Sequence, residues 1–322
     1  MNTARRRYFY QLYGVIIETE DPFPDLTPVP PPRRDIPSQR IFVARQEKLS
    51  LWRAKNGWSS FYGLDYWFSS DRRFAVIQSS KIGVYRIDFK RKRIRWSPAQ
   101  KASSTYCHAM LRVRILGFLV SHMTPSLLLH ASVVVRKGVG IALGGFTTAG
   151  KSTLTACCLN DGFSLLSDDI AAIQKENGSF FLHPGSPEFR LWPWTARRLN
   201  PQGAQGEYIT PEVKKKKFIL GPASPWRFTD NPVPLRAIYL LSRKGRGDEV
   251  RIENLHGKEA VLGVLENIYN PIFKNSKLLA HQLEMAAPLI RKVSVKRLVY
   301  PSGFVHLPRV RSAIVKDIAY TG

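Results

Sequence analysis

The chain has 322 residues, of which 44% are hydrophobic and 23% charged, and its formal net charge at pH 7 is +25. This hydrophobic content excludes a disordered chain, and the length suffices for one large or two modest domains. The cysteines at positions 107, 157 and 158 form neither a disulfide framework nor a zinc pattern, so we expect a cytoplasmic protein.

Residues 1–105 are predicted to form a small β-rich domain, which acts as a peptide-binding or accessory part. Residues 1–20 are apolar and aromatic enough for strands, whereas residues 21–37 contain seven prolines and are expected to be extended or loop. Partial alternation predicts further strands at 73–77 and 83–89. No internal repeat is evident.

Aromatic side chains are concentrated in this first part of the chain. They are Trp52, Trp58, Tyr62, Tyr66, Trp67 and Phe68. Two interpretations stay open for them. They form either a peptide-binding surface, since aromatic anchors are favoured at interfaces, or the core of the small β domain.

A basic excess runs through the whole chain, and the calculated pI is about 10.3. Residues 1–120 hold 22 Lys and Arg against 9 Asp and Glu, and local runs occur at Lys90–Arg95 and Lys214–Lys217. Such runs attract nucleic acid, anionic lipid or acidic peptides, although a solvated surface explains them equally well. Because no zinc spacing or RNA-recognition signature is present, we expect an acidic peptide or small-protein partner rather than nucleic acid.

Residues 106–322 are predicted to form an α/β domain. A helix is expected at Tyr106–His122, followed by an apolar strand at Leu127–Val135 that carries His130. Arg112 and other polar residues interrupt the apolar stretch, so it is not expected to span a membrane.

The stretch Gly145–Thr153 reads G-F-T-T-A-G-K-S-T and fits the phosphate-binding pattern G-x-x-x-x-G-K-[ST]. An apolar run at 139–144 suits a buried strand, and residues 152–160 suit a helix, which is the arrangement that places a helix N-terminus against an anion. Lys151 is expected to reach the outer phosphates and Ser152 to bind Mg²⁺. The residues predicted to hold the nucleotide are Gly145, Thr147, Thr148, Ala149, Gly150, Lys151, Ser152 and Thr153.

Asp168 and Asp169 follow the next apolar run, Phe163–Ser167. A carboxylate at the end of a strand near a phosphate loop is expected to serve as a Mg²⁺ ligand or a general base. Adjacent residues of an extended backbone point in different directions, so the two carboxylates suit different roles. The residues alone do not decide which one is the base.

Two further residues have open interpretations. His130 is either a packed residue of its strand or, if the next strand forms a hairpin with it, a neighbour of the phosphates. Arg190 follows a turn in His183–Trp192 and is either a phosphate or carboxylate contact or a surface arginine beside Trp192.

Four segments together, in this order and at these spacings, resemble the HPr serine kinase catalytic domain. The likeness is closest to the HPr-kinase-related serine kinases of lasso-peptide biosynthesis clusters. The segments are L-H-A-S at 129–132, the phosphate loop, L-L-S-D-D at 165–169 and H-P-G-S-P-E-F-R-L-W at 183–192. Weaker likeness at 13–26, 233–241, 265–269 and 293–298 extends the resemblance over nearly the whole chain.

The resemblance implies an α/β fold with a P-loop kinase domain of HPr-kinase type, preceded by the small β-rich domain. It implies ATP and Mg²⁺ as cofactors, with Lys151 and Ser152 binding phosphate and Mg²⁺, Asp168 as the base, and Asp169 with His130 supporting the site. The expected catalytic residues are thus Lys151, Asp168, Asp169 and His130, and Asp169 is the expected metal ligand beside Ser152. The family usually has Ser-Gly where this chain has Thr147-Thr148, and the branched Thr148 is less suited to a strained loop.

The expected activity is therefore transfer of the γ-phosphate of ATP to a serine hydroxyl of a ribosomally made precursor peptide. The alternative acceptors are another small protein and a small-molecule hydroxyl. The alternative function is that of a nucleotide-binding regulator with weak ATPase activity. The sequence leaves open the acceptor, the direction of any reverse reaction and whether the chain forms a homo-oligomer.

Overall fold

The computed structural model divides into two compact units. One unit contains Met1–Pro125 with Asn270–Lys274, and the other contains Ser126–Tyr269 with Asn275–Gly322. Residues 106–125, predicted to begin the second domain, thus belong to the first unit. The structure describes residues 6–23, 25–32, 39–46, 48–49, 58–61, 63–71, 73–200, 204–208, 215–244, 247, 249–269 and 276–320.

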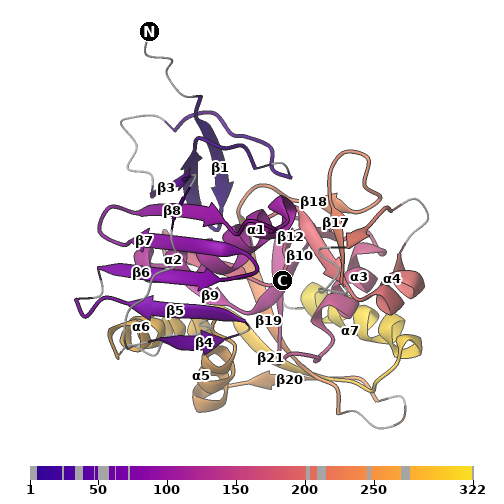
Figure 1. Ribbon diagram of the computed structural model, residues 1–322. Coiled ribbons are helices and arrows are strands. Elements are labelled where there is room, and N and C mark those ends of the chain that lie inside the picture. The colour runs from indigo at the N-terminus through magenta and orange to yellow at the C-terminus, as the bar shows by residue number, and fades with distance from the viewer. Residues whose placement is uncertain are drawn as a thin grey trace. The chain divides into compact units, whose positions relative to one another are not determined.

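The first unit is built on a sheet whose described strands run in the order β1-β2-β3-β8-β7-β6-β5-β4 (Figure 1). The strands are β1 (Tyr8–Leu12), β2 (Val15–Thr19), β3 (Arg40–Arg45), β4 (Ser59–Phe61), β5 (Leu64–Phe68), β6 (Phe74–Ser79), β7 (Gly83–Asp88) and β8 (Arg93–Pro98). The strands predicted at 73–77 and 83–89 are confirmed, and β1 and β2 confirm the prediction for residues 6–20. Residues 1–5 of that prediction lie outside the described ranges.

The predicted helix at 106–122 forms, although it is not a uniform α-helix. Helix α1 (Ser104–Met110) continues through the π-helical turn η1 (Leu111–Leu116) into α2 (Gly117–Met123). The hydroxyl of Tyr85 donates to the carbonyl oxygen of Cys107 at 3.1 Å, which ties the helix to β7. Among the described helices, none is both long and apolar enough to span a lipid bilayer.

The aromatic residues of this unit have different surroundings. Tyr66 is 2% exposed and belongs to the core. Phe68 is half-buried, and its ring packs against Phe118 with centroids 5.8 Å apart. The core interpretation is therefore confirmed for Tyr66, and Phe68 lies at the edge of that core. Trp52 and Tyr62 lie outside the described residues.

The second unit is mixed α/β and contains a large sheet and a small one (Figure 1). The large sheet holds β9 (Leu127–Leu129), β10 (Ala131–Arg136), β11 (Val139–Gly144), β12 (Ser164–Ser167), β13 (Ala171–Glu176), β14 (Ser179–His183), β18 (Arg227–Phe228), β19 (Val233–Ser242), β20 (Arg251–Leu255) and β21 (Ser294–Val299). The small sheet holds β15 (Glu188–Leu191), β17 (Lys216–Ile219) and β16 (Glu207–Tyr208). The helices are α3 (Lys151–Leu159), α4 (Pro193–Leu199), α5 (Gly257–Glu266), α6 (Ser276–Lys292), the 3₁₀ turn η2 (Phe304–His306) and α7 (Leu307–Tyr320).

Helices cover both faces of the large sheet. Alternate residues of β11 and β19 point to opposite faces, so Leu143 joins a core with α3 and α7, whereas Ala142 joins a second core with α5 and α6. Two hydrophobic layers therefore hold the sheet rigid from either side. Between α4 and β18, the described part of residues 200–217 includes β16 and the start of β17.

The strand predicted at Leu127–Val135 is wrong in one respect, because it is interrupted at His130. Strand β9 pairs with β13, whereas β10 pairs with β11 and β12. The backbone N–H of His130 donates instead to the carbonyl oxygen of Asn267 at 2.7 Å. The apolar run looks the same on both sides of His130, although the two halves pair with different strands. Its hydrophobic periodicity therefore could not reveal the break.

A buried charged group joins the large sheet to α7. Lys296 on β21 is 2% exposed, and its ammonium donates to Oδ2 of Asp317 at 2.6 Å. The hydroxyl of Tyr239 on β19 donates to the same oxygen at 2.5 Å. One carboxylate on α7 thus compensates polar groups from two adjacent strands.

We expect Asp317→Ala to lower the free energy of unfolding by about 3 kcal/mol, because it leaves the ammonium of Lys296 buried without this partner. Chemical denaturation measures the effect. Glu284→Ala, on the exposed side of α6, is the control and should change stability by less than about 0.5 kcal/mol. Adding Lys296→Met to Asp317→Ala should restore most of the loss, and a double variant as unstable as the single one would refute this explanation.

Candidate functional site

The strand order brings the predicted site residues to one edge of the large sheet. Strand β10 lies between β11 and β12 and is antiparallel to both, with Ala131 opposite Gly144 and Val133 opposite Ser167. Strands β11 and β12 therefore run parallel to each other, and their carboxyl ends meet at the same edge. The phosphate loop follows one end and Asp168-Asp169 follows the other, which is where open α/β sheets usually bind ligands.

The predicted phosphate loop joins β11 to α3, as the sequence indicated. Gly145 and Gly150 have φ angles of 141° and 98°, which other residues rarely adopt. A Cβ on Gly150 would also lie 2.7 Å from the hydroxyl oxygen of Tyr300. Helix α3 begins directly after this loop, so the unpaired N–H groups of its first turn face the same edge.

Lys151 is the buried cation of the loop. Its ammonium donates to the carbonyl oxygens of Gly145 and Phe146, at 2.6 and 3.3 Å. Burial lowers the pKa of Lys151, and the nearby negative charges of Asp169 and Asp168 partly offset that effect. These charge effects show that the ammonium and the two carboxylates lie within electrostatic range of one another.

Asp168 lies deep in the protein, with part of its surface still open to solvent. One carboxylate oxygen accepts a hydrogen bond from the hydroxyl of Ser132 at 2.7 Å, and the other accepts one from the backbone N–H of Arg190 at 3.2 Å. Burial, followed by the charge of Asp169, raises the pKa of Asp168 to about 7. A carboxyl group with this pKa exchanges a proton readily at neutral pH.

Asp169 has a φ angle of 66°, a left-handed conformation that Asp tolerates better than most residues. His130 Nδ1 lies 3.1 Å from the carbonyl oxygen of Asp169, so this ring nitrogen is the donor. The contact fixes the backbone of Asp169 while its carboxylate stays partly exposed, at 29%. The structure thus brings His130 to the carboxylate pair, through a backbone contact.

Arg190 also belongs to the carboxylate cluster. Its guanidinium pairs with Glu188 on the same strand, and Nη1 lies 3.8 Å from Oδ2 of Asp169. Burial lowers the pKa of Arg190, but the charges of Glu188 and Asp169 raise it by more, so the side chain stays charged. The side chain of Arg190 is 16% exposed, so it is not a surface arginine. Its expected contact with a phosphate or a peptide carboxylate stays a prediction.

Ser152 and Asp169, the predicted metal ligands, offer oxygen donors of the kind that Mg²⁺ prefers. Ser152 lies in the first turn of α3, beside Lys151. Within the described ranges, no cluster of three or more His, Cys, Asp or Glu side chains forms a complete protein metal site. Mg²⁺ is usually bound by one or two protein oxygens together with substrate phosphates and water, and a hydroxyl and a carboxylate are ligands of that kind. Thr153, also predicted to hold the nucleotide, is half-buried in the same turn.

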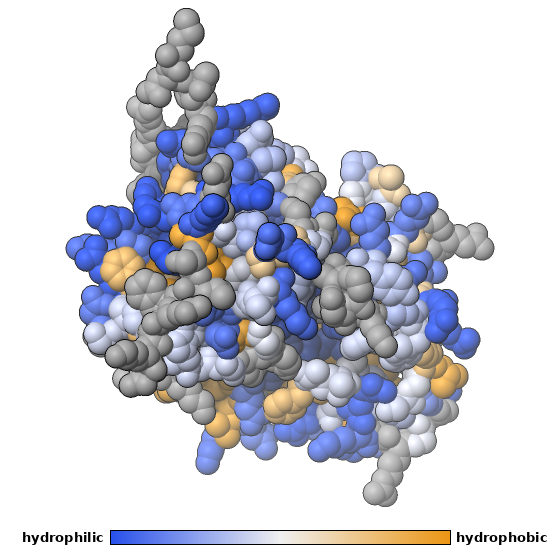
Figure 2. All heavy atoms as spheres, in the orientation of Figure 1, coloured by the Kyte–Doolittle hydropathy of each residue, from blue (hydrophilic) through white to orange (hydrophobic). Residues whose placement is uncertain are grey.

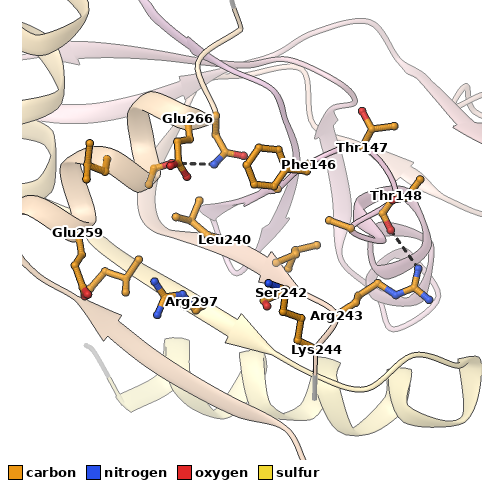
Figure 3. A pocket seen from close by; sticks show the side chains of 17 residues that line it. Phe146, Thr147, Thr148, Leu240, Ser242, Arg243, Lys244, Glu259, Glu266 and Arg297 are labelled. Carbon is orange, nitrogen blue, oxygen red and sulfur yellow. Dashed lines mark hydrogen bonds between the residues drawn. The ribbon is translucent and has the colours of Figure 1, made fainter. Parts of the chain in front are cut away.

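A pocket of about 530 Å³ opens beside the phosphate loop, within the range typical of small-molecule sites. Figure 3 shows Phe146, Thr147 and Thr148 of the loop on one side and residues from β19 and α5 around the rest. Its charged side chains come from Arg243, Lys244, Glu259, Glu266 and Arg297. The pocket therefore continues from the phosphate loop into a cavity with apolar and charged walls.

Several residues of the site were not assigned a role from the sequence. Ser132 lies in the quoted L-H-A-S segment, two residues after His130. This strand-like spacing was the signal that could have indicated a role for it. Tyr300 donates to the carbonyl oxygen of Ala149 at 2.8 Å, and Arg243 donates to that of Thr148 at 3.2 Å. These two are far away in sequence, and nothing in their local pattern connects them to the loop.

Lys215, which the sequence shows only as part of a basic run, also acts on the site. The pKa values of Asp168 and Lys151 are set first by burial and then by neighbouring charges, including that of Lys215. Its ammonium lies 5.4 Å from the ring centroid of Trp192. Lys214, the first residue of the run, lies outside the described residues.

Comparisons with known proteins give little. No family model matches the chain, and no curated protein matches it. Among solved structures, the HPr(Ser) kinase/phosphatase from Coxiella burnetii is similar over 61% of this chain and 99% of that chain, with 12% identity and a TM-score of 0.33. A likeness this weak carries no argument about fold or activity, so the roles of the site residues rest on the geometry above and stay predictions.

We expect Thr148→Gly to raise the free energy of unfolding by up to about 1 kcal/mol, because Thr148 has a φ of 73° and the left-handed region strains a branched residue. Thermal or chemical denaturation measures the change. The matched control is Thr147→Gly at the adjacent position, which has no positive φ. It should lower stability by about 0.5–1 kcal/mol, and equal shifts in both variants would contradict the assignment of strain to Thr148.

Proposed function

We propose that this protein is an ATP- and Mg²⁺-dependent serine kinase that transfers the γ-phosphate of ATP to a serine hydroxyl. One observation carries the proposal. A glycine loop with a buried lysine and a carboxyl group of pKa about 7 lie at the same edge of one sheet. A phosphate cradle next to a group able to accept a proton is what transfer of a phosphoryl group to a hydroxyl requires.

The nucleotide would occupy the loop and the adjacent pocket. Backbone N–H groups at the start of α3 and the ammonium of Lys151 suit the phosphates. The pocket lined by Leu240, Leu262 and Asn267 has the size and mixed polarity that a nucleoside needs. Phe146, which is 72% exposed, lies at the wall of this pocket and can cover a bound base (Figure 3).

Asp168 is the group that would accept the proton of the acceptor serine. Its two hydrogen bonds, from Ser132 and from the backbone of Arg190, fix the carboxylate in place. Its raised pKa makes it a stronger base than an ordinary carboxylate while leaving about half of it ionised at neutral pH. Lys151 and Arg190 place positive charge around the reacting groups and offset the charge of the transferring phosphoryl group.

Ser152 and Asp169 would hold Mg²⁺, which when bound neutralises phosphate charge. The contact from His130 to the backbone of Asp169 fixes the left-handed turn that presents this carboxylate. His130 therefore acts in the proposal as a positioning residue. The adjacent carboxylates divide the work, since Asp168 is deeply placed and Asp169 more exposed.

For the acceptor, we propose a ribosomally made precursor peptide of the lasso type with an acidic segment. The sequence likeness to lasso-cluster kinases and the formal charge of +25 support this choice. A small protein or a small-molecule hydroxyl would use the same site. A nucleotide-binding regulator would need the loop but not a carboxyl group tuned to neutral pH, so the pKa of Asp168 favours an enzyme.

Lys151→Ala is expected to abolish phosphorylation, because it removes the cation directed at the phosphates. The measurement is intact-mass spectrometry of candidate precursor peptides incubated with ATP and Mg²⁺, which should show a gain of one phosphate mapped to a serine. Lys175→Ala, an exposed residue of β13, serves as control and should retain the activity. Consumption of ATP without any modified peptide would point to a small-molecule acceptor or to the regulator.

Asp168→Asn should leave ATP affinity nearly unchanged while transfer falls on the order of 10²-fold or more, because the amide cannot take the serine proton. Since only the ionised carboxylate accepts a proton, kcat/KM of the wild type should rise with pH and level off above about 7. The residual rate of the variant should lack this rise. Transfer that survives the substitution with the same pH profile would remove Asp168 as the base.

A further inference from the structure

Asn267, the C-cap residue of α5, lies in the wall of the pocket beside the phosphate loop and is 8% exposed. Two apolar side chains of the same wall are much more open to solvent, since Phe146 is 72% exposed and Leu262 of α5 is 46% exposed. Figure 2 shows hydrophobic residues at the surface where α5 lies in Figure 1. In Figure 3 the ring of Phe146 points toward Glu266, the residue before Asn267. One buried polar side chain thus shares the pocket with apolar groups that a flat aromatic ligand would cover.

Both backbone groups of Asn267 are used within the fold. Its N–H donates to the carbonyl oxygen of Val264 at 3.1 Å, and its carbonyl oxygen accepts a hydrogen bond from the N–H of His130 at 2.7 Å. The second bond ties the end of α5 to the break between β9 and β10. The backbone from which this side chain starts is therefore fixed from two directions.

The end of the helix also orients the side-chain amide of Asn267. Because the backbone N–H of Asn267 bonds to Val264, the carbonyl oxygen of Gly263 lacks the donor that a continuing helix would supply. Nδ2 of Asn267 donates to that oxygen instead, at 2.8 Å. A carbonyl oxygen only accepts hydrogen bonds, so the amide nitrogen must face Gly263 and the amide oxygen must face away from it.

The amide oxygen of Asn267, Oδ1, is open to the pocket. None of the described residues donates a hydrogen bond to it, and it is not one of the described unpaired atoms that are fully buried. A Cβ placed on Gly144 would lie 3.3 Å from Oδ1, so this oxygen lies beside the end of β11, where the phosphate loop begins. The pocket therefore presents one fixed hydrogen-bond acceptor next to the loop.

A fixed acceptor distinguishes nucleobases by the group that faces it. The exocyclic amino group of adenine is a donor, whereas guanine and hypoxanthine have a carbonyl oxygen at the same position. Two acceptors placed together leave both without a donor, which costs free energy in a partly buried site. Glu259 and Glu266 of the same wall are also acceptors, but both are exposed, so water satisfies their oxygens whichever base is bound.

We propose that Asn267 is a specificity-determining residue, whose Oδ1 accepts a hydrogen bond from the amino group of adenine and disfavours bases with a carbonyl oxygen at that position. The inference rests on the proposed function, because it requires that the pocket hold the base of a nucleotide whose phosphates lie in the loop. It adds the residue that selects ATP over nucleotides with an oxygen at that position. Phe146 would cover any base, so it contributes affinity without this selection.

The test is isothermal titration calorimetry of the full chain with Mg²⁺ and either ADP or inosine diphosphate, whose hypoxanthine base has the carbonyl oxygen. The wild type should bind ADP at least about tenfold more tightly. Asn267→Leu should reduce this ratio to within about twofold by weakening ADP binding. Asn267→Asp also loses the bond to Gly263 but keeps an oxygen directed at the pocket, so it should keep most of the preference. Comparing the two variants separates the loss of selection from the loss of the helix cap.

Two controls isolate the contribution of the base. Asn254→Leu makes the same chemical change at an exposed position of β20 and should alter the ratio by less than about twofold. Inorganic pyrophosphate has no base and reports on the loop alone. It should bind the wild type and Asn267→Leu alike, and Lys151→Ala at least about tenfold more weakly.

The outcomes that overturn the inference differ from those that overturn the kinase. Equal affinity of the wild type for ADP and inosine diphosphate, with pyrophosphate still bound, would refute the role of Asn267 and leave the proposed function intact. A preference that survives Asn267→Leu, or that is lost in Glu266→Gln instead, would assign the selection to another residue. A wild type that binds neither ADP nor pyrophosphate would overturn the proposed function, and the inference with it.

Discussion

The position of β10 between β11 and β12 is the constraint on which the rest of the site depends. Because β10 is antiparallel to both neighbours, the strand before the glycine loop and the strand before Asp168 must end at one edge. Ser132 on β10 then reaches the carboxylate of Asp168 across the sheet, at 2.7 Å. A slip of one residue in this register would turn Ser132 to the opposite face and separate it from that carboxylate.

Charged side chains lie close together at the same edge. Each of them alone would cost free energy to bury. Lys151 and Asp168 are both desolvated, and burial lowers the pKa of the lysine while it raises that of the aspartate. Arg190, with its own partner Glu188, adds a charge that stays positive. The fold holds these groups through hydrophobic layers on both faces of the sheet, so their positions do not depend on the strength of their mutual attraction.

Much of this edge was predictable because its signals are local. The glycine loop, its flanking strand and helix, and the carboxylates after β12 follow from short patterns. The break at His130 was not predictable, because the apolar run continues through it. The contacts of Tyr300 and Arg243 with the loop were not predictable either, because these residues follow parallel strands far along the chain. The role of Lys215 was not predictable either, because the Lys214–Lys217 run fits an ordinary solvated surface equally well. Its effect on the pKa of Asp168 comes from its position in space, directly before β17.

Two residues far along the chain stabilise the strained backbone of the phosphate loop. Thr148 occupies a left-handed position, where glycine would be unstrained, and Arg243 binds its carbonyl oxygen. Tyr300 binds the carbonyl oxygen of the next residue, Ala149, and its burial raises the pKa of the phenol to about 12, so it remains a neutral donor. Both donors come from the carboxyl ends of β19 and β21, which are parallel to β11. The strained turn is thus fixed by the strand order that also aligns the carboxylates, and one topology provides both halves of the site.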